Sequence, residues 1–308
     1  MQPSTTRYLI FFQYLGSKYS GVMKTPAHQS VEGVQNYLEN AVRRLKPLNE
    51  VSVFISSRTD TGVHALCNSA HLDIQRKADK PPLTEKIMAD ALNYFLKPEE
   101  IRITRVCRVP SDFHARYYAM SRTYVYRLAT GVSHHSEMPV TEKDLCWALR
   151  DTKLDISAMQ EASAVLTGMH DFSTFRAMSS DALFKSPVKT MELVQVQPGL
   201  SFSQRHFHRD IQFWELSFKS RSFLYKQVRR MTGALVAVGQ GKLSARQIQE
   251  LLDARDSVAY PHNMAAPPCG LFLTNVEYKE SGKSLSDLRS FCLVVMADYL
   301  LFLGVYLF

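Results

Sequence analysis

The apolar positions of the chain change their spacing from one segment to the next, and these changes predict alternating strands and helices. Residues 8–12 and 101–106 are runs of aliphatic, aromatic and β-branched residues, as in buried strands. Across 31–45 and 84–95, apolar residues recur every three or four positions, as on one face of a helix. Ser30 and Thr84 precede these two segments, so we expect them to cap the helices.

Two more strands are expected at 51–55 and 70–74, so the first part of the chain follows the order strand, helix, strand, strand, helix, strand. This is the order of the split βαβ, or ferredoxin-like, unit. The later elements are predicted as strands at 121–128, 191–196, 213–219 and 271–276, and as helices at 156–166, from Phe223, and from Ser244 to Ala254. The sequence therefore predicts an α+β fold of two ferredoxin-like α/β halves, whose sheets meet along a central cleft. We place the halves at 1–110 and 111–280, with a linker and apolar tail at 281–308.

A polar loop between the strands at 51–55 and 70–74 carries a single carboxylate, Asp60, two residues after Arg58. Gly62 allows the chain to bend there without a Cβ clash. If the two side chains meet, the arginine would lower the pKa of the aspartate by about 1–3 units, and an ionised, positioned carboxylate can act as a nucleophile. The alternative is a surface ion pair worth about 0–1 kcal/mol, which the spacing alone favours.

Composition narrows the class of protein. Of the 308 residues, 45% are hydrophobic and 21% charged, as in a globular protein, and the net charge of +8 favours an anionic partner, nucleic acid first. The five cysteines are scattered and form no C-x-x-C, which argues against a zinc ribbon and a disulfide framework and for a reducing compartment. His134–His135 and His206–His208 have no cysteine or carboxylate at ligand spacing, so we expect no metal site.

Residues 57–65, Ser-Arg-Thr-Asp-Thr-Gly-Val-His-Ala, resemble the active-site signature of the TruA family of tRNA pseudouridine synthases, usually G-R-T-D-A-G-V-H-A. Ser57 and Thr61 depart from that pattern without removing a charge. Further segments match the family in the same order, at 113–116, 122–126, 170–175, 223–233 and 266–273. The resemblance covers roughly Arg7 to Tyr278.

The resemblance implies the pseudouridine synthase fold and the isomerisation of uridine to pseudouridine in RNA, with tRNA as the first candidate and mRNA as the second. It implies no cofactor. In the family's arrangement Asp60 would be the nucleophile, Arg58 and Arg229 would orient it, Tyr124 would contact the target base, and Leu271 would pack beside that base. The segment at 170–175 is expected to be structural or to flank the cleft. Attack of Asp60 on C1′ and removal of the 2′ proton to give a glycal both stay open.

Expectations about the cellular location and the oligomeric state come from the family resemblance. Bacterial members of the family pair as dimers, so a homodimer is one expectation. Eukaryotic members imply a mitochondrial location, although the first residues show no presequence and the cytoplasm and nucleus stay open. Residues 291–308 are apolar apart from Asp298. That length is near the minimum for a membrane span, but a central aspartate costs about 2.5–3.5 kcal/mol on insertion, so we favour a role other than a membrane anchor for this tail.

Three rival functions fit parts of the sequence. The first is an RNA-binding protein without catalysis on the same fold, for which Asp60 would be dispensable. The second is a glycoside hydrolase, which usually needs two carboxylates, and no partner acid is evident. The third is a membrane-anchored interaction protein, which depends on the tail alone.

Overall fold

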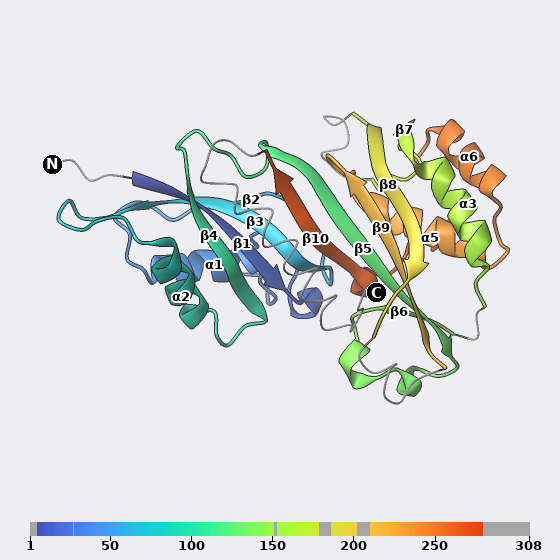
Figure 1. Ribbon diagram of the computed structural model, residues 1–308, viewed down its shortest axis with the longest axis horizontal. Helices are drawn as coiled ribbons and strands as arrows, with labels where there is room; N and C mark the ends of the chain where they lie inside the picture. The colour runs from blue at the N-terminus through green and yellow to red at the C-terminus, as the bar shows by residue number, and fades with distance from the viewer. Residues whose placement is uncertain (1–4, 27, 151–152, 179–185, 202–209, 280–308) are drawn as a thin grey trace, which may run out of the picture. The chain divides into compact units, whose positions relative to one another are not determined.

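The computed structural model describes residues 5–26, 28–150, 153–178, 186–201 and 210–279. Residues up to Glu277 form one compact unit (Figure 1). The predicted linker and apolar tail lie outside the described residues, as do His206 and His208. Within the described ranges, no helix is both long and apolar enough to span a bilayer.

The first half has the predicted order of elements. They are β1 (Thr5–Tyr14), α1 (Val34–Arg43), β2 (Val53–Ile55), β3 (His64–Gln75), α2 (Glu85–Phe95) and β4 (Ile101–Val109), with a 3-10 turn at Gly16–Lys18. Strand β1 lies between β4 and β3, and β2 pairs with the other edge of β3, so the strand order is 4-1-3-2. This arrangement confirms the ferredoxin-like prediction for this half.

The start of α1 differs from the prediction. The helix begins at Val34 after Gly33, and Ser30 is not its cap. The carbonyls of Gly21 and Val22 accept hydrogen bonds from the amides of Val34 and Gln35, at 3.1 and 2.9 Å. Backbone groups from another loop therefore satisfy the first turn, so no side-chain cap is needed there. Thr84 does cap α2, because its hydroxyl accepts from the amide of Ile87.

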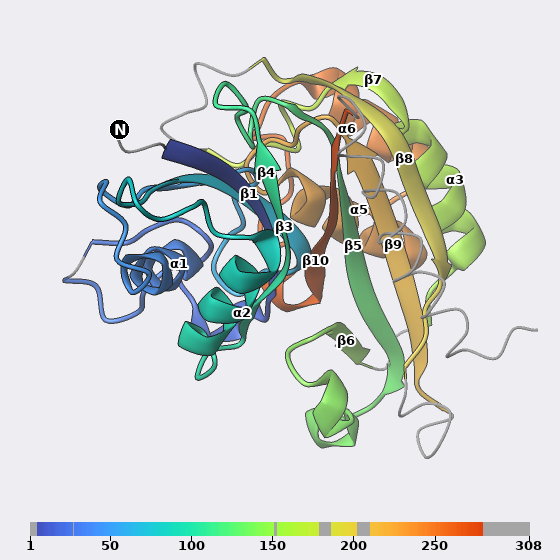
Figure 2. The same cartoon turned by 60° about the vertical axis from the view of Figure 1, so that its left-hand side comes forward.

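The second half repeats the same strand order with additions. Its main elements are β5 (Ala119–Val132), α3 (Ile156–Leu166), β8 (Val188–Pro198), β9 (Gln212–Ser220), α5 (Gln227–Gly239) and β10 (Leu271–Tyr278). Short additions are β6 (Trp147–Arg150), β7 (Gly168–Asp171), α6 (Ala245–Ala254) and 3-10 turns at His135–Glu137, Val140–Glu142 and Pro268–Gly270. The order β10-β5-β9-β8 is again 4-1-3-2, and α3 packs against α5, α6 and β8 (Figures 1 and 2).

Helix α5 begins later than the sequence predicts. Residues 223–226 form a turn, and the helix starts at Gln227 after Lys226, whose φ is 56°. The side chain of Gln227 folds back to accept from the amide of Leu224 at 2.8 Å. Ser244 caps α6 as predicted, in a capping box with Gln247.

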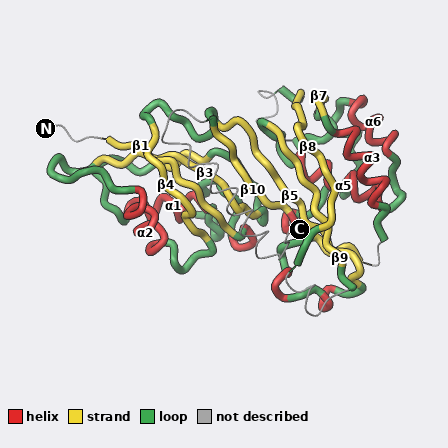
Figure 3. Tube along the Cα trace, viewed as in Figure 1, coloured by secondary structure: helices red, strands yellow, loops and turns green. Residues whose placement is uncertain are grey.

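The two halves join through β10. This strand lies between β3 and β5, so the sheets of the two halves form one ten-stranded sheet (Figures 2 and 3). Its contact with β3 is parallel and short, pairing Phe272 with His64 and Leu273 with Ala65. The structure confirms the α+β class, and the halves meet edge to edge. The boundary at residue 110 falls between β4 and β5 and stays a prediction.

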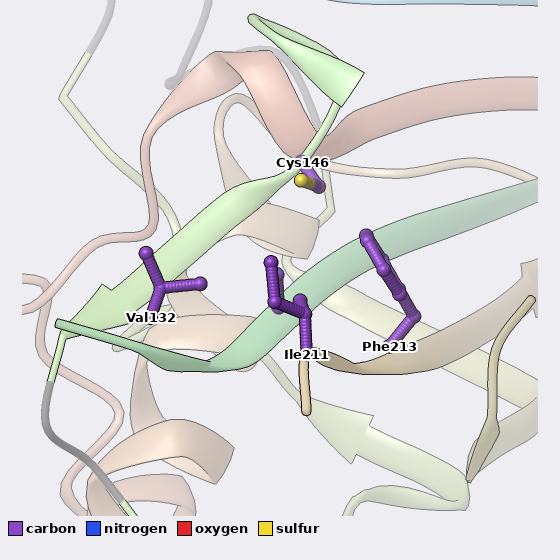
Figure 4. Packing of buried hydrophobic residues seen from close by; sticks show 5 residues of the cluster. Val132, Cys146, Ile211 and Phe213 are labelled. Carbon is purple, nitrogen blue, oxygen red and sulfur yellow. The ribbon is translucent and has the colours of Figure 1, made fainter. Parts of the chain in front are cut away.

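A small apolar cluster closes the far end of β5. Its members are Ala129 and Val132 of β5, Cys146 just before β6, Ile211 just before β9, and Phe213 of β9. Figure 4 shows Val132, Cys146, Ile211 and Phe213 close together. Cys146 and Cys269 are free thiols. Within the described ranges, no group of three or more histidines, cysteines and carboxylates could hold a metal ion.

Candidate active site

Asp60 lies on the loop that joins β2 to β3. The amide of Val63 donates to the carbonyl of Asp60 at 3.1 Å, which closes a turn around Gly62. Gly62 has a φ of +76°, a conformation that favours glycine. The side chain of Asp60 is 28% exposed, so its carboxylate is reachable from solvent while the backbone around it is fixed.

Buried polar side chains from β1 and β3 anchor this loop. The hydroxyls of Tyr14 and Thr59 are 2.7 Å apart, and Asn68 donates to the carbonyl of Ser57 at 2.9 Å. Asn68 also lies 3.4 Å from the hydroxyl of Tyr14. Burial raises the pKa of Tyr14 to about 12, so the phenol stays protonated at neutral pH. The residue before Asp60 is therefore held by a buried hydrogen-bond network.

A buried arginine of β5 fixes the same loop from the other half. Arg122 donates to the hydroxyls of Ser56 and Ser57, at 3.4 and 3.3 Å. The same guanidinium donates to the carbonyls of Arg116 and Arg221, at 2.9 and 2.6 Å. Because one rigid group reaches three segments, the position of the loop depends on β5.

Arg229 provides the cation beside the carboxylate. It lies in the first turn of α5, and its Nη1 is 3.4 Å from Oδ2 of Asp60. Its Nε donates to the carbonyl of Ala266 at 2.8 Å, and its own carbonyl accepts from the amide of Ala266 at 3.0 Å. These two bonds aim the guanidinium, whose side chain is only 15% exposed. An ion pair that is shielded from water in this way is stronger than one on an open surface.

Tyr124 of β5 is buried near the same carboxylate. Its ring meets that of Phe223 edge to face, at 5.1 Å between centroids. Burial raises the pKa of Tyr124 well above its usual value, and the nearby Tyr14 and Asp60 add smaller effects in the same direction. The phenol is therefore neutral at physiological pH and lies close to both of those residues.

The two remaining predicted site residues, Leu271 and Arg58, differ in their surroundings. Leu271 is buried at the start of β10, one residue before the pairing of Phe272 with His64. The ring of Pro268 lies against Gly62, 3.0 Å from where a Cβ would be. Arg58 is exposed, and its role toward Asp60 stays a prediction. The structure thus brings Arg229 and Tyr124 to Asp60, with the start of β10 beside the loop.

Sequence reasoning missed the residues that hold the site in place. Tyr14 and Arg122 lie far from Asp60 in sequence, Asn68 follows it by eight residues, and nothing in their spacing predicts these contacts. His64 lies in the motif at 57–65, but the motif alone did not indicate its structural role. It is fully buried, its Nδ1 accepts from the amide of Gly16 at 3.0 Å, and its Nε2 lies 3.1 Å from the carbonyl of Cys269. Burial lowers the pKa of His64, so this neutral ring joins β3 to the segment before β10.

Comparisons with known proteins agree with this geometry. A family model described as tRNA pseudouridine synthase matches residues 10–118 and 162–279. The chain is 54% identical to tRNA pseudouridine synthase-like 1 of Xenopus laevis over 279 residues, which is 90% of this chain and 93% of that protein. It is 48% identical to the Homo sapiens protein of the same name over 285 residues, 92% of this chain and 93% of that protein. It is 38% identical to tRNA pseudouridine synthase A of Maricaulis maris over 274 residues, 88% of this chain and 98% of that protein.

The fold, the loop carboxylate and these matches define an RNA-modifying isomerase. The chain belongs to the tRNA pseudouridine synthase family. The predicted family and enzyme class are therefore confirmed.

Proposed function

We propose that Asp60 is the nucleophile that converts uridine to pseudouridine in tRNA. The observation that carries the proposal is the contact between Asp60 and Arg229, which holds a solvent-accessible carboxylate beside a fixed cation. Such a contact orients the carboxylate, and a positioned carboxylate can attack as a nucleophile. The rest of the loop is held by buried groups, so the carboxylate is positioned before RNA binds.

The reaction rearranges one base without oxidation or net hydrolysis. The bond from C1′ to N1 breaks, the uracil turns, a bond from C1′ to C5 forms, and the proton on C5 leaves while N1 gains one. Atoms and electrons balance within the nucleoside, so the step needs no cofactor. What the protein must supply is a carboxylate, a support for the free base and exclusion of water from the ribosyl intermediate.

Tyr124, Leu271 and the arginines fit these tasks. Tyr124 lies near Asp60 with a neutral phenol, which suits contact with an uncharged uracil and late transfer of the C5 proton. Buried Leu271, at the start of β10, is suited to cover the base and keep water away. Arg229 would hold the carboxylate, and Arg58 would help to orient it.

Both chemical routes begin from the same carboxylate, that of Asp60. In the first, Asp60 attacks C1′ and forms an ester with the ribose. In the second, loss of the 2′ proton gives a glycal. Deuterium at C2′ distinguishes the two routes. Only the second route breaks the bond between C2′ and this hydrogen, so deuterium should slow the reaction in single-turnover measurements only if that route is followed.

The decisive experiment compares wild type with Asp60→Asn by mapping pseudouridine across total RNA from cells that express either protein. We expect tRNA sites to disappear in the variant, and any mRNA sites to disappear with them. RNA binding by the two proteins is measured in parallel. Unchanged sites, with RNA binding intact in both proteins, would favour the RNA-binding protein without catalysis.

We also propose a mitochondrial location and a homodimer, which rest on the resemblance to other members of the family. Fractionation of cells expressing the full chain tests the first, and the fraction that holds the protein also reports any membrane contact of residues 291–308. Light scattering of the purified chain tests the second. A cytosolic or nuclear fraction, or a monomer mass, would overturn the corresponding proposal.

A further inference from the structure

Four rings are in contact one after another on β2, β3 and the segment after β4, outside the catalytic contacts. The ring of Phe54 lies flat on His71, its partner in the strand register, with centroids 4.7 Å apart and planes at 11°. His71 meets His114 at 4.6 Å, and His114 meets Tyr117 at 4.4 Å. The neighbours of Phe54 on β2, Val53 and Ile55, are buried, so the ring of Phe54 lies on the opposite side of the strand.

The two outer rings of this cluster are open to solvent. Phe54 is 46% exposed and Tyr117 is 70% exposed, whereas His71 is buried. His71 is fixed because its Nδ1 accepts from the amide of Ala115 at 3.2 Å. Burial lowers the pKa of both histidines, so the inner rings are uncharged at neutral pH. The exposed rings are therefore held in place by rigid, neutral neighbours, which reduces the entropy lost when a ligand stacks on them.

The cluster is connected to the catalytic loop through Arg122. This guanidinium bonds the carbonyl of Arg116 at 2.9 Å and also holds Ser56 and Ser57, which follow β2. The guanidinium of Arg116 lies over the ring of Tyr117, 6.0 Å from its centroid. Arg221, whose carbonyl also accepts from Arg122, is exposed, as is Arg58. Arginines thus occur beside Tyr117 and on the segments that Arg122 holds together.

We propose that Phe54 and Tyr117 form a stacking surface for unpaired RNA bases that flank the target uridine, and that Arg116 contacts the adjacent phosphate. The inference rests on the proposed function, which makes RNA the substrate. Every base has a face that can stack on an aromatic ring, and arginine beside such rings is a common arrangement in proteins that bind single-stranded RNA. The arginines near the rings and the direct link to the catalytic loop favour RNA over an apolar protein partner.

The test measures RNA affinity of the full chain carrying Asp60→Asn, so that no turnover occurs. The probes are unfractionated tRNA, a short unpaired RNA, and a duplex of the same sequence. Phe54→Ala and Tyr117→Ala should each weaken binding of tRNA and of the unpaired RNA by about 5- to 100-fold, with little change for the duplex. Tyr117→Phe and Phe54→Tyr, which keep the rings, should bind like the parent protein.

Tyr94→Ala is the matched control, because Tyr94 is 72% exposed on α2 and away from β2. It should leave all three affinities unchanged. If Phe54→Ala proves unstable, Phe54→Leu retains the apolar bulk without a ring and should still lose affinity. In active protein, Tyr117→Ala should raise KM and leave kcat near the wild-type value.

Equal RNA affinity of the parent and the two alanine variants would overturn the proposal. An equal loss on the duplex would do the same, because bases would then not be the feature recognised. Unchanged RNA affinity combined with a lower mass in solution would assign the surface to a protein contact and likewise overturn it. Failure of the proposed function is separate, since it would appear as pseudouridine formation by Asp60→Asn.

Discussion

Nη1 of Arg229 lies 3.4 Å from the carboxylate of Asp60, although 169 positions separate the two residues in the chain. Asp60 comes from a loop of the first half and Arg229 from α5 of the second. Nε of the same guanidinium is held by the carbonyl of Ala266. The charge balance of the site therefore depends on how the second half is joined to the first.

Replacing Arg229 should slow the chemical step more than it weakens RNA binding. A hydrogen bond to a charged group contributes about 1.5–3 kcal/mol, so Arg229→Gln should lower kcat about 10- to 100-fold. Arg229→Lys keeps the charge but cannot bond Ala266 and Asp60 from one rigid group, so its loss should be intermediate. Tritium release from C5-labelled uridine in single-turnover reactions measures the rate of the chemical step for wild type and for both variants. Equal rates for all three proteins would contradict the role of this contact.

Arg122 should matter for both stability and catalysis. Arg122→Met removes the donor to Ser56, Ser57 and two carbonyls, and buried acceptors without a partner should cost about 2–4 kcal/mol of unfolding free energy. The turnover number should fall as well, because the Asp60 loop loses its support. The control is Arg246→Met, which removes an exposed pair with Glu250 and should change stability by less than about 0.5 kcal/mol. Urea denaturation and kcat together test this prediction, which fails if the two variants behave alike.

Gly270 should not tolerate a side chain. A Cβ at this position would lie 2.6 Å from the carbonyl of Arg127 and equally close to the ring of Tyr126. Gly270→Ala should therefore push the start of β10 away from β5 and lower stability by about 1–3 kcal/mol. Activity should fall too, since Leu271 follows directly. Cys269→Ala serves as the neighbouring control, and a Gly270→Ala protein as stable as that control would show that the strand can shift freely.

Stability should decrease in acid partly because of His71. Burial and the nearby His114 and Arg7 lower the pKa of His71 to about 4, below the value of about 6.5 in an unfolded chain. Between these values the unfolded state binds more protons, so the contribution of neutral His71 is complete above pH 6.5 and is lost as the pH falls toward 4. The loss amounts to about 3 kcal/mol, at about 1.4 kcal/mol for each unit of pKa.

His71→Phe removes the titrating group and keeps a ring for Phe54. It should flatten the slope of unfolding free energy against pH over the same interval, measured by urea denaturation at a series of pH values. A slope identical to that of wild type would mean that other groups cause the acid sensitivity.

The sequence was most informative where a local pattern determines the outcome. Helix α3 covers the predicted residues 156–166, and Thr84 and Ser244 cap their helices as expected. The predicted starts of two helices were wrong where particular hydrogen bonds, and not the apolar pattern, set the first residue. Ser30 is not a cap because carbonyls from Gly21 and Val22 satisfy α1, and α5 starts at Gln227 because that side chain turns back on Leu224.

In the active site, too, residues within local motifs could be predicted, whereas residues that act through distant contacts could not. Motif order located Asp60, Tyr124 and Arg229, because the loop, strand and helix that carry them each have a recognisable local pattern. The supporting residues Tyr14 and Arg122 act through contacts across 45 and 65 positions, and such contacts leave no periodic signal in one sequence. The pairing of β10 with strands of both halves was likewise not evident from the sequence, because the neighbours of a strand depend on contacts across the whole sheet.

The position of β10 also sets an order of assembly during synthesis. Strands β3 and β5 are made early, but β10, which lies between them, is among the last described elements to leave the ribosome. Until then the edge of β3 beside the Asp60 loop is unpaired, and such an edge can pair with another chain. Contacts this distant in sequence also form slowly. The nascent protein therefore has a long interval in which its catalytic loop is present but its site is incomplete, and in that interval it should depend on chaperones.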